Sequence, residues 1–318
     1  MVSRCSVQPL VSVVILYYKR REIIEQTLRS VLDQEYENLE IILVDNHSED
    51  DVSEIVARLD GGIRLIEMPA NAGACAGRNV GIRAARGEYI VFVDDDVCFS
   101  DSGEVARVVR TFTERPDMHV LALQVCDPHT GRVRLREWCH TRPYDPYAEE
   151  EFETVWFGEG ASAFRREVFD TCGLYYEPLY YGAEGHDMVV RILDRGFRIL
   201  HTPGIRVLHW ASESGRSLDR QYYYFTRNFI WMACKDYRPW DGFRFLVPKL
   251  LMMAYFAART STYRPVLRGI RDGLTGLPTA WRDRTPISRG TLSFLAEQEK
   301  WRPTVFVRFA RHRAQPQI

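Results

Sequence analysis

The sequence predicts an α/β fold with a mostly parallel, Rossmann-like sheet, followed by a helical C-terminal extension. Two observations predict this fold. In the first hundred residues, short runs of β-branched residues alternate with segments whose apolar residues have helical spacing. From about Gly215 onward, this alternation gives way to helical patterns and a basic composition. A chain of 318 residues is long enough for one large α/β domain with an appendage.

The expected strands of the first half are almost wholly apolar, as in strands buried on both faces of a sheet. They are residues 11–16, 41–44, 63–66 and 89–93. The expected helices between them are residues 22–32, 52–59 and 74–85. Strand and helix repeating at this spacing indicate βαβ units and a parallel sheet with helices on both faces. Ligands of such sheets bind at the carboxyl ends of the strands, so the residues directly after each strand are the candidates for a site.

The pattern is less regular after Asp96. The expected elements are a helix over 105–112, a strand over 120–125, helices within 168–200 around a loop rich in Tyr and Gly, and a strand over 205–210. Residues 127–153 are polar and contain proline, which indicates a variable excursion. We therefore predict two regions, an α/β domain over 1–215 and a basic, helical region over 216–318.

The net charge of −1 conceals an asymmetry between these regions. Residues 1–215 hold 23 Lys and Arg against 36 Asp and Glu, which gives −13, whereas 216–318 hold 19 against 7, which gives +12. The apolar run 250–258 is far shorter than the roughly 20 residues of a spanning helix. Two interpretations of the tail remain open: an amphipathic helix at a membrane surface, or packed helices with a solvated basic face.

The seven cysteines form no CxxC pair, which favours free thiols in a reducing compartment. The first residues show no charged-then-apolar leader. The expected location is the cytoplasm, with peripheral contact at the inner face of the membrane if the tail is interfacial. No feature indicates a nucleic-acid partner.

Acidic residues follow the fourth expected strand directly, as Asp94, Asp95 and Asp96. Carboxylates buried at the edge of a sheet need water, a cation or a donor. Those one residue apart can jointly bind a hard divalent ion such as Mg²⁺ or Mn²⁺, which would neutralise a diphosphate leaving group. A solvated acidic loop is the alternative.

Two other strand ends carry polar or aromatic side chains. Tyr17 and Tyr18 follow the first strand, where an aromatic face could stack on a nucleobase. Asp45 and Asn46 follow the second, where a carboxylate could accept from a base or a ribose. Each alone could be an ordinary loop residue, but three such strand ends in one sheet predict a nucleotide site.

A glycine-rich loop, residues 71–81, runs into a helix and includes Arg78. Glycines permit close backbone approach, a helix start attracts anions, and arginine binds phosphate through paired hydrogen bonds. The spacing is neither GxGxxG nor that of a P-loop, which argues against a dinucleotide dehydrogenase and a P-loop NTPase. In the alternative, the glycines serve tight packing and Arg78 is solvated.

As an ordered set, several stretches resemble the family 2 glycosyltransferases of GT-A fold. They are VSVVILYYKR, IILVDNHSEDD, NAGACAGRNVGIRAARGEYIVFVDDD and RILDRGFRILHTPGIRVLHWAS, and the resemblance covers about residues 10–230. It implies an inverting transfer of a sugar from a nucleotide-diphospho-sugar, with Mg²⁺ or Mn²⁺.

The resemblance also implies roles for individual residues. Tyr18 and Asp45 would hold the base, and Arg78 the nucleotide or diphosphate. The acidic triplet would supply the rest, with Asp94 at the ribose or metal, Asp95 in the same nucleotide-sugar site and Asp96 at the metal. His209 takes a position where some members use a histidine as a metal or diphosphate contact; otherwise it is a packed strand histidine.

The catalytic base of such a transfer falls on Glu184-Gly185-His186-Asp187, where the family usually reads Glu-Asp-x-Asp-Leu-x-x-Arg. The second acid, often the base, is Gly185 here. We expect Glu184 to be the base, with Asp187 orienting or supporting it. In the alternative, Glu184 caps the helix and Asp187 pairs with Arg191.

An aromatic cluster lies nearby in the sequence and could stack on an acceptor sugar or pack in the core. Its members are Trp156, Tyr175, Tyr176, Tyr180 and Tyr181. The predicted function is an inverting glycosyltransferase acting on a glycan or polyprenol-linked acceptor, in cell-surface polysaccharide synthesis. A degenerate nucleotide-sugar-binding protein and a nucleotidyltransferase remain the alternatives.

Overall fold

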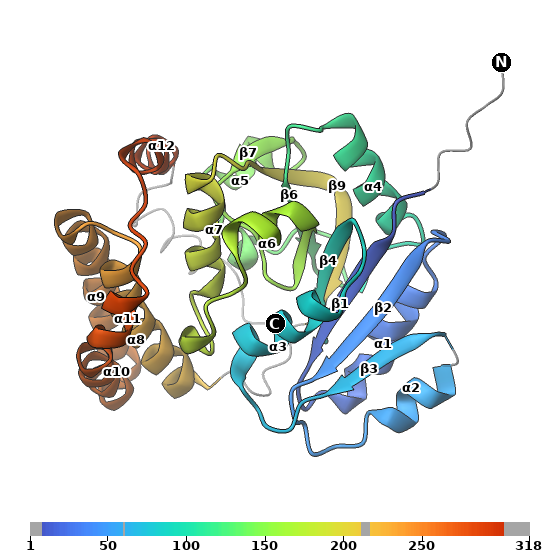
Figure 1. Ribbon diagram of the computed structural model, residues 1–318, viewed down its shortest axis with the longest axis horizontal. Helices are drawn as coiled ribbons and strands as arrows, with labels where there is room; N and C mark the ends of the chain where they lie inside the picture. Colours follow the sequence, from blue (N-terminus) through green and yellow to red (C-terminus); the bar gives the residue numbers. More distant parts are fainter. Residues whose placement is uncertain (1–7, 60, 211–216, 302–318) are drawn as a thin grey trace.

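The computed structural model describes residues 8–59, 61–210 and 217–301 (Figure 1). Within these residues the chain forms one nine-stranded sheet with helices on both faces and further helices at one end. The strands are β1 (Val11–Tyr17), β2 (Leu39–Asp45), β3 (Ile63–Glu67), β4 (Tyr89–Asp94), β5 (Val97–Phe99), β6 (Val120–Cys126), β7 (Phe152–Thr154), β8 (Ala161–Arg165) and β9 (Ile199–His209). Their order is β3-β2-β1-β4-β8-β6-β9-β5, and β7 also pairs with β9.

The sheet is mostly parallel, as the sequence predicts, with three antiparallel additions. Strands β3, β2, β1 and β4 are parallel, and β6 is parallel to β9. Strand β8 lies antiparallel between β4 and β6, while β5 and β7 pair antiparallel with β9. The expectation of a mostly parallel sheet is therefore confirmed, and the antiparallel strands lie in its second half. Strands β5, β7 and β8 have three to five residues, which is too short for a periodic signal in the sequence.

The helices over the sheet are α1 (Arg21–Leu32), α2 (Ser53–Leu59), α3 (Gly73–Ala84), α4 (Glu104–Glu114), α5 (Tyr144–Tyr147), α6 (Arg166–Cys172) and α7 (Glu184–Asp194), with short 3-10 turns η1 (Leu135–Glu137) and η2 (Glu177–Leu179). Alternate residues of each strand face opposite layers, since side chains on a strand alternate between faces. Val13 and Ile15 pack under α1, α2 and α4, whereas Val14 packs under α3, α6 and α7. Two apolar cores therefore sandwich the sheet.

The C-terminal helices are α8 (Leu218–Lys235), α9 (Pro239–Thr260), α10 (Tyr263–Thr275), α11 (Leu277–Arg282) and α12 (Arg289–Glu299). Figure 1 shows them gathered at the end of the molecule opposite β3. The predicted boundary at 215/216 lies outside the described residues. No helix in the described ranges is both long and apolar enough to span a membrane. The six cysteines within those ranges are free.

Helix α8 joins this extension to the sheet layer. Its buried Asn228 donates through Nδ2 to the carbonyl oxygens of Leu179, Tyr181 and Gly182, at 3.0, 2.9 and 2.6 Å. These carbonyls belong to the loop that leads into α7, where Ala183 has a left-handed φ of 68°. Helix α8 therefore fixes the backbone directly before Glu184.

Candidate active site

The carboxyl ends of β1, β2 and β4 meet at one edge of the sheet and bring the predicted residues together. In the register of the parallel ladders, Tyr17 lies opposite Asp45 and Leu16 lies opposite Asp94. The aromatic and acidic strand ends are therefore neighbours in space. This follows from parallel pairing, since strands that run the same way end at the same edge.

Asp95 and Asp96 turn back toward β1 and are held by Arg20. The Arg20 Nη1 lies 2.9 Å from Asp95 Oδ1 and also contacts Asp96 Oδ2. The amide N–H of Tyr18 donates to Asp95 Oδ2 at 2.8 Å. Burial raises the pKa of Asp95 to about 7, against the opposing charge of Arg20. The acidic triplet is thus a partly buried, charge-compensated cluster rather than a solvated loop.

His209, at the end of β9, lies between two carboxylates. Its Nε2 is 3.3 Å from Asp96 Oδ2, and its Nδ1 is 2.9 Å from Glu137 Oε2. Burial alone would lower the pKa of His209, but the hydrogen bonds to Asp96 and Glu137 raise it to about 9. The imidazole is therefore held against the acidic triplet in its charged form.

Asp45 and Tyr18 lie at the other side of the same edge. Buried Asp45 accepts from the amide N–H of Ser48 at 3.0 Å and from the Ser48 hydroxyl. The Tyr18 ring is half-buried, and the Lys19 ammonium lies 5.4 Å from its centroid. A carboxylate and an aromatic face are thus presented together.

Arg78, on α3, lies at the centre of the cluster and is only 5% exposed. Its Nη2 lies 2.9 Å from Asp94 Oδ1, and its Nη1 lies 3.4 Å from Glu184 Oε1. The Asp94 side chain is 37% exposed, so its carboxylate is the solvent-accessible member of this group of ion pairs. The interpretation of Arg78 as a solvated arginine is excluded by this burial.

Glu184 begins α7 and is nearly enclosed. Its Oε2 is buried without a hydrogen-bond partner among the described residues. Burial, and next the negative charge of Glu159, raise the pKa of Glu184 to about 7. A carboxyl group in this state can exchange a proton near neutral pH, as general acid–base chemistry requires.

Asp187 lies one turn further along α7, within a different set of contacts. It is fully buried, and its carboxylate contacts Arg191 Nη2 at 2.7 Å and Lys235 Nζ at 2.6 Å. Lys235 also contacts Asp236 at 2.5 Å. Burial alone would raise the pKa of Asp187, but the two cations lower it to about 2. The pair with Arg191 anticipated from the sequence is formed, and Asp187 ties α7 to α8.

The residues predicted to bind metal offer suitable donor chemistry. Asp94 and Asp96 carry carboxylate oxygens, and the His209 imidazole would have to release its proton before its nitrogen could ligate Mg²⁺ or Mn²⁺. Over 8–59, 61–210 and 217–301, no three metal-ligating side chains are already gathered into one cluster. Mg²⁺ typically uses one or two carboxylates and completes its shell with water and phosphate oxygens, so a partial protein set fits such an ion.

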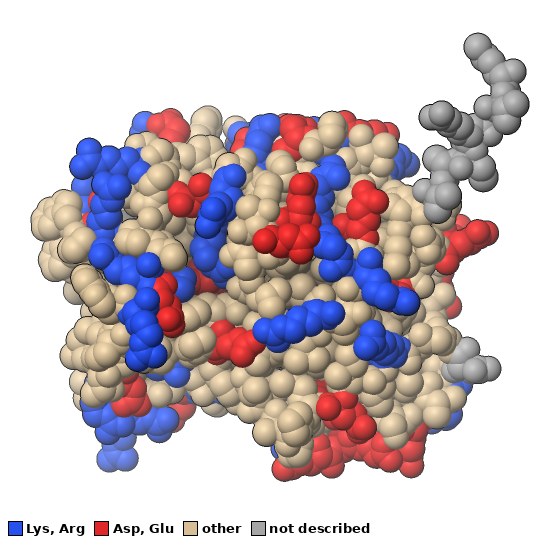
Figure 2. Space-filling view, in the orientation of Figure 1, with Lys and Arg blue, Asp and Glu red and all other residues tan. Residues whose placement is uncertain are grey.

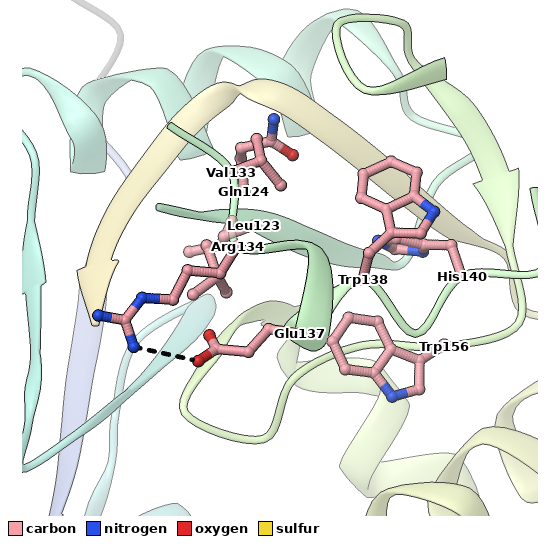
Figure 3. A pocket seen from close by; sticks show the side chains of 9 residues that line it. Leu123, Gln124, Val133, Arg134, Glu137, Trp138, His140 and Trp156 are labelled. Atoms are coloured by element: carbon pink, nitrogen blue, oxygen red, sulfur yellow. Dashed lines mark ion pairs between the residues drawn. The ribbon is translucent and has the colours of Figure 1, made fainter. Parts of the chain in front are cut away.

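The aromatic residues near the site do not form one surface. Tyr175 is buried beside Phe92, and Tyr180 stacks on Tyr224 with ring centroids 5.2 Å apart. Trp156 lines a small cavity next to Glu137, shown in Figure 3 with Trp138 and His140 facing it. Its volume of about 10 Å³ holds at most one water, so a sugar does not fit there in this conformation.

Three residues that the sequence analysis missed contribute to the cluster: Arg20, Glu137 and Glu159. Arg20 stands three positions after β1, where a cation near the strand-end acids could have been anticipated. Glu137 lies in the polar excursion and Glu159 in the turn before β8. Neither has a local signal, because only the tertiary fold brings them to His209 and Gly185.

Comparison with known proteins gives the family of this chain and its fold. The family model described as "Glycosyl transferase family 2" matches residues 12–173. A candidate teichuronic acid biosynthesis glycosyltransferase, TuaG of Bacillus subtilis, is 38% identical over 92 residues, which are 28% of this chain and 36% of that protein. The UDP-Glc:alpha-D-GlcNAc-diphosphoundecaprenol beta-1,3-glucosyltransferase WfaP of Escherichia coli is 39% identical over 88 residues, 27% and 35% of the two chains. The chain therefore spans about a third of the length of these curated relatives.

Among solved structures, the mannosyltransferase PcManGT of Pyrobaculum calidifontis, in complex with GDP-Man and Mn²⁺, superposes with a TM-score of 0.55. The two are 18% identical, and the match covers 92% of this chain and 80% of that one. The likeness shows the fold, and the prediction of a GT-A architecture with added C-terminal helices is confirmed.

Proposed function

The chain belongs to glycosyl transferase family 2, and we propose that it transfers a sugar, with inversion, from a nucleotide-diphospho-sugar to an acceptor hydroxyl during polysaccharide synthesis. One observation carries this proposal. Arg78 is buried between Asp94, at the end of β4, and Glu184, at the start of α7. A phosphate-binding cation, a strand-end acid and a titratable carboxylate therefore converge at the carboxyl edge of the sheet.

The donor would lie along this edge. In this proposal Tyr18 and Asp45 hold the nucleobase, since Tyr18 directly follows β1 and Asp45 ends the neighbouring strand β2. Asp94 and Asp95 contact the nucleotide sugar, and Arg78 binds the diphosphate. Arginine suits that role because its planar fork of donors matches phosphate oxygens. Its present contact with Asp94 holds the side chain in place until the diphosphate arrives.

Asp94, Asp96 and His209 would hold Mg²⁺ or Mn²⁺. Such an ion would supply charge neutralisation to the departing diphosphate. Among relatives of the fold, PcManGT was solved with Mn²⁺. Arg20 contacts both Asp95 and Asp96 and offsets part of the negative charge of the triplet.

The proton acceptor lies at the start of α7. We assign this role to the Glu184 carboxylate. Asp187 supports Glu184 by anchoring α7 through Arg191 and Lys235. Because Asp187 and Lys235 are both buried, removal of either one would leave the opposite charge buried without its partner. Helix α7 is thereby held with its first turn facing Asp94 and Arg78.

The acceptor is proposed to be a glycan or polyprenol-linked sugar presented at an anionic membrane surface. WfaP, to which the chain is similar, is named for an acceptor that carries diphosphoundecaprenol. On α9, Trp240 and Leu251 are 67% and 66% exposed, and Trp240 stacks on exposed Phe243. Figure 2 shows Lys and Arg side chains spread over the C-terminal helices on the left. On α9 itself, Arg244 and Arg259 are exposed. Exposed aromatic and basic residues on one helix suit the interface of an anionic bilayer.

The test is incubation with UDP-glucose, UDP-N-acetylglucosamine, GDP-mannose and dTDP-glucose in Mn²⁺, with water as the acceptor. Slow release of a nucleoside diphosphate and a free sugar is the expected result, and NMR of the first-formed sugar gives its anomeric configuration. Binding in a thermal-shift assay without turnover would indicate a degenerate binding protein. Consumption of a nucleoside triphosphate with a sugar 1-phosphate would indicate a nucleotidyltransferase.

A further inference from the structure

The space beside Gly185 is filled by a carboxylate from another part of the chain. A Cβ built on Gly185 would lie 2.3 Å from Glu159 Oε1 and 2.8 Å from its Cδ. The amide N–H of Gly185 donates to that same Oε1 at 2.8 Å. The second residue of α7, Gly185, therefore has no side chain, and the Glu159 carboxylate occupies the space that a side chain there would fill.

Glu159 reaches this position from the turn between β7 and β8, where the N–H of Ala161 donates to the Gly158 carbonyl at 3.1 Å. The next residue, Gly160, accepts from the amide N–H of Asp94 at 3.2 Å. Glu159 is thus held between the donor-site acid Asp94 and the start of α7. Its side chain is partly exposed, whereas Glu184 is 5% exposed and enclosed by Arg78.

Resting on the proposed function but replacing Glu184 as its base, we propose that Glu159 is a catalytic residue, the one that accepts the proton of the acceptor hydroxyl. The acceptor hydroxyl oxygen forms a bond to the anomeric carbon as the bond from that carbon to the diphosphate oxygen breaks. The diphosphate leaves with the bonding electron pair. The hydroxyl proton passes to the Glu159 carboxylate and from there to solvent, so no further reactant is needed.

Two features suit Glu159 to this role. Its Oε1 accepts from the Gly185 amide N–H at 2.8 Å, which fixes the carboxylate at the start of α7. It is also partly exposed, so a proton that it accepts can pass to solvent, whereas Glu184 is only 5% exposed.

A purely structural interpretation would make Glu159 a cap for α7. Glu159→Gln separates the two, because the amide oxygen can still accept from Gly185 while the basic carboxylate is lost. With the donor that the unaltered chain hydrolyses, we expect turnover to fall by about 10²–10⁴-fold. The melting temperature and the thermal shift given by that donor should match those of the unaltered chain. Glu150→Gln, an exposed glutamate upstream of the same segment, is the matched control and should retain full turnover.

A swap of the carboxylate between the two positions gives a second readout. Glu159→Ala empties the space, and adding Gly185→Asp places a carboxylate there from α7. The double variant should regain at least about tenfold of the turnover that Glu159→Ala loses, a recovery of about 1.4 kcal/mol in activation free energy. A double variant that folds but stays at the level of Glu159→Ala would overturn the proposal.

The outcomes separate this inference from the proposed function. If the unaltered chain turns over a donor and Glu159→Gln does so equally well, the inference fails and the function stands. A Gln variant with lowered melting temperature and lowered donor binding would assign Glu159 to capping alone. No binding and no turnover of any donor by the unaltered chain would remove both proposals.

Discussion

Gly160 gives a direct test of the donor site, because its missing side chain makes room for Asp94. A Cβ on Gly160 would lie 2.0 Å from Asp94 Cγ and 2.3 Å from Oδ2. Non-bonded carbon atoms need about 3.5–4.0 Å, so Gly160→Ala must push the Asp94 carboxylate away by at least about 1 Å. That displacement opens the 2.9 Å contact between Asp94 Oδ1 and Arg78 Nη2.

The expected magnitude follows from this displacement. Misplacing a reacting or binding group by about 1 Å typically costs about 10²-fold in rate, or about 2.7 kcal/mol. We expect Gly160→Ala to lower kcat/KM for nucleoside diphosphate release by about that factor. The assay is coupled detection of nucleoside diphosphate with Mn²⁺ and the hydrolysed donor, with a melting curve for each variant.

Gly158 provides a matched control in the same turn. A Cβ there would meet Trp156 at 3.5 Å, which is ordinary van der Waals contact, so Gly158→Ala should leave kcat/KM within about twofold. Equal activity of the two alanine variants would refute the placement of Asp94 in the donor site.

Three further predictions concern the helix anchor, the metal and the tail. Asp187→Asn should lower the free energy of unfolding in urea by about 3–5 kcal/mol, because Lys235 is left buried with less opposing charge; a loss below about 1 kcal/mol would contradict this anchor. The pKa of Asp187 is lowered from its usual 3.8 to about 2. Its carboxylate therefore adds about 2–3 kcal/mol to the free energy of unfolding above pH 4, and this contribution is lost as pH falls through 2. In acid titration the unaltered chain should accordingly lose stability more steeply than the Asn variant. Asp96→Asn should abolish turnover and the Mn²⁺ dependence of donor binding in a chain that still folds, and undiminished activity would remove the metal assignment. Trp240→Ser with Phe243→Ser should reduce co-sedimentation with anionic vesicles of phosphatidylglycerol, whereas equal recovery with neutral vesicles would count against membrane contact.

Much of the first half of the fold was predictable because its signals are local. The side chains of β1, β2 and β4 are largely apolar on both faces of the sheet, so these strands can be recognised from their own residues alone. Parallel pairing then places Tyr18, Asp45 and Asp94 at one edge. The family resemblance added roles to these positions, and the fold that it implied is confirmed.

The second half was less predictable because its elements are short or depend on distant partners. Strand β8 has five residues and lies antiparallel between β4 and β6. No periodic pattern in the sequence predicts this strand or its position. The helical character of 217–301 was anticipated, but the role of Asn228 in holding the loop before α7 was not. A buried amide bonded to three carbonyls leaves no trace in the local sequence.

The sequence by itself determined the parallel first half of the sheet, its carboxyl edge and the donor-site candidates, because parallel strands carry strand-end residues to one edge whatever their loops do. The tertiary structure alone decided how the charges pair. It showed Asp187 tied to Lys235 on α8, Arg20 set against Asp95 and Asp96, and Glu159 filling the space at Gly185. These contacts join residues that are far apart in the sequence. Their charges and shapes come to match only when folding brings them together in space.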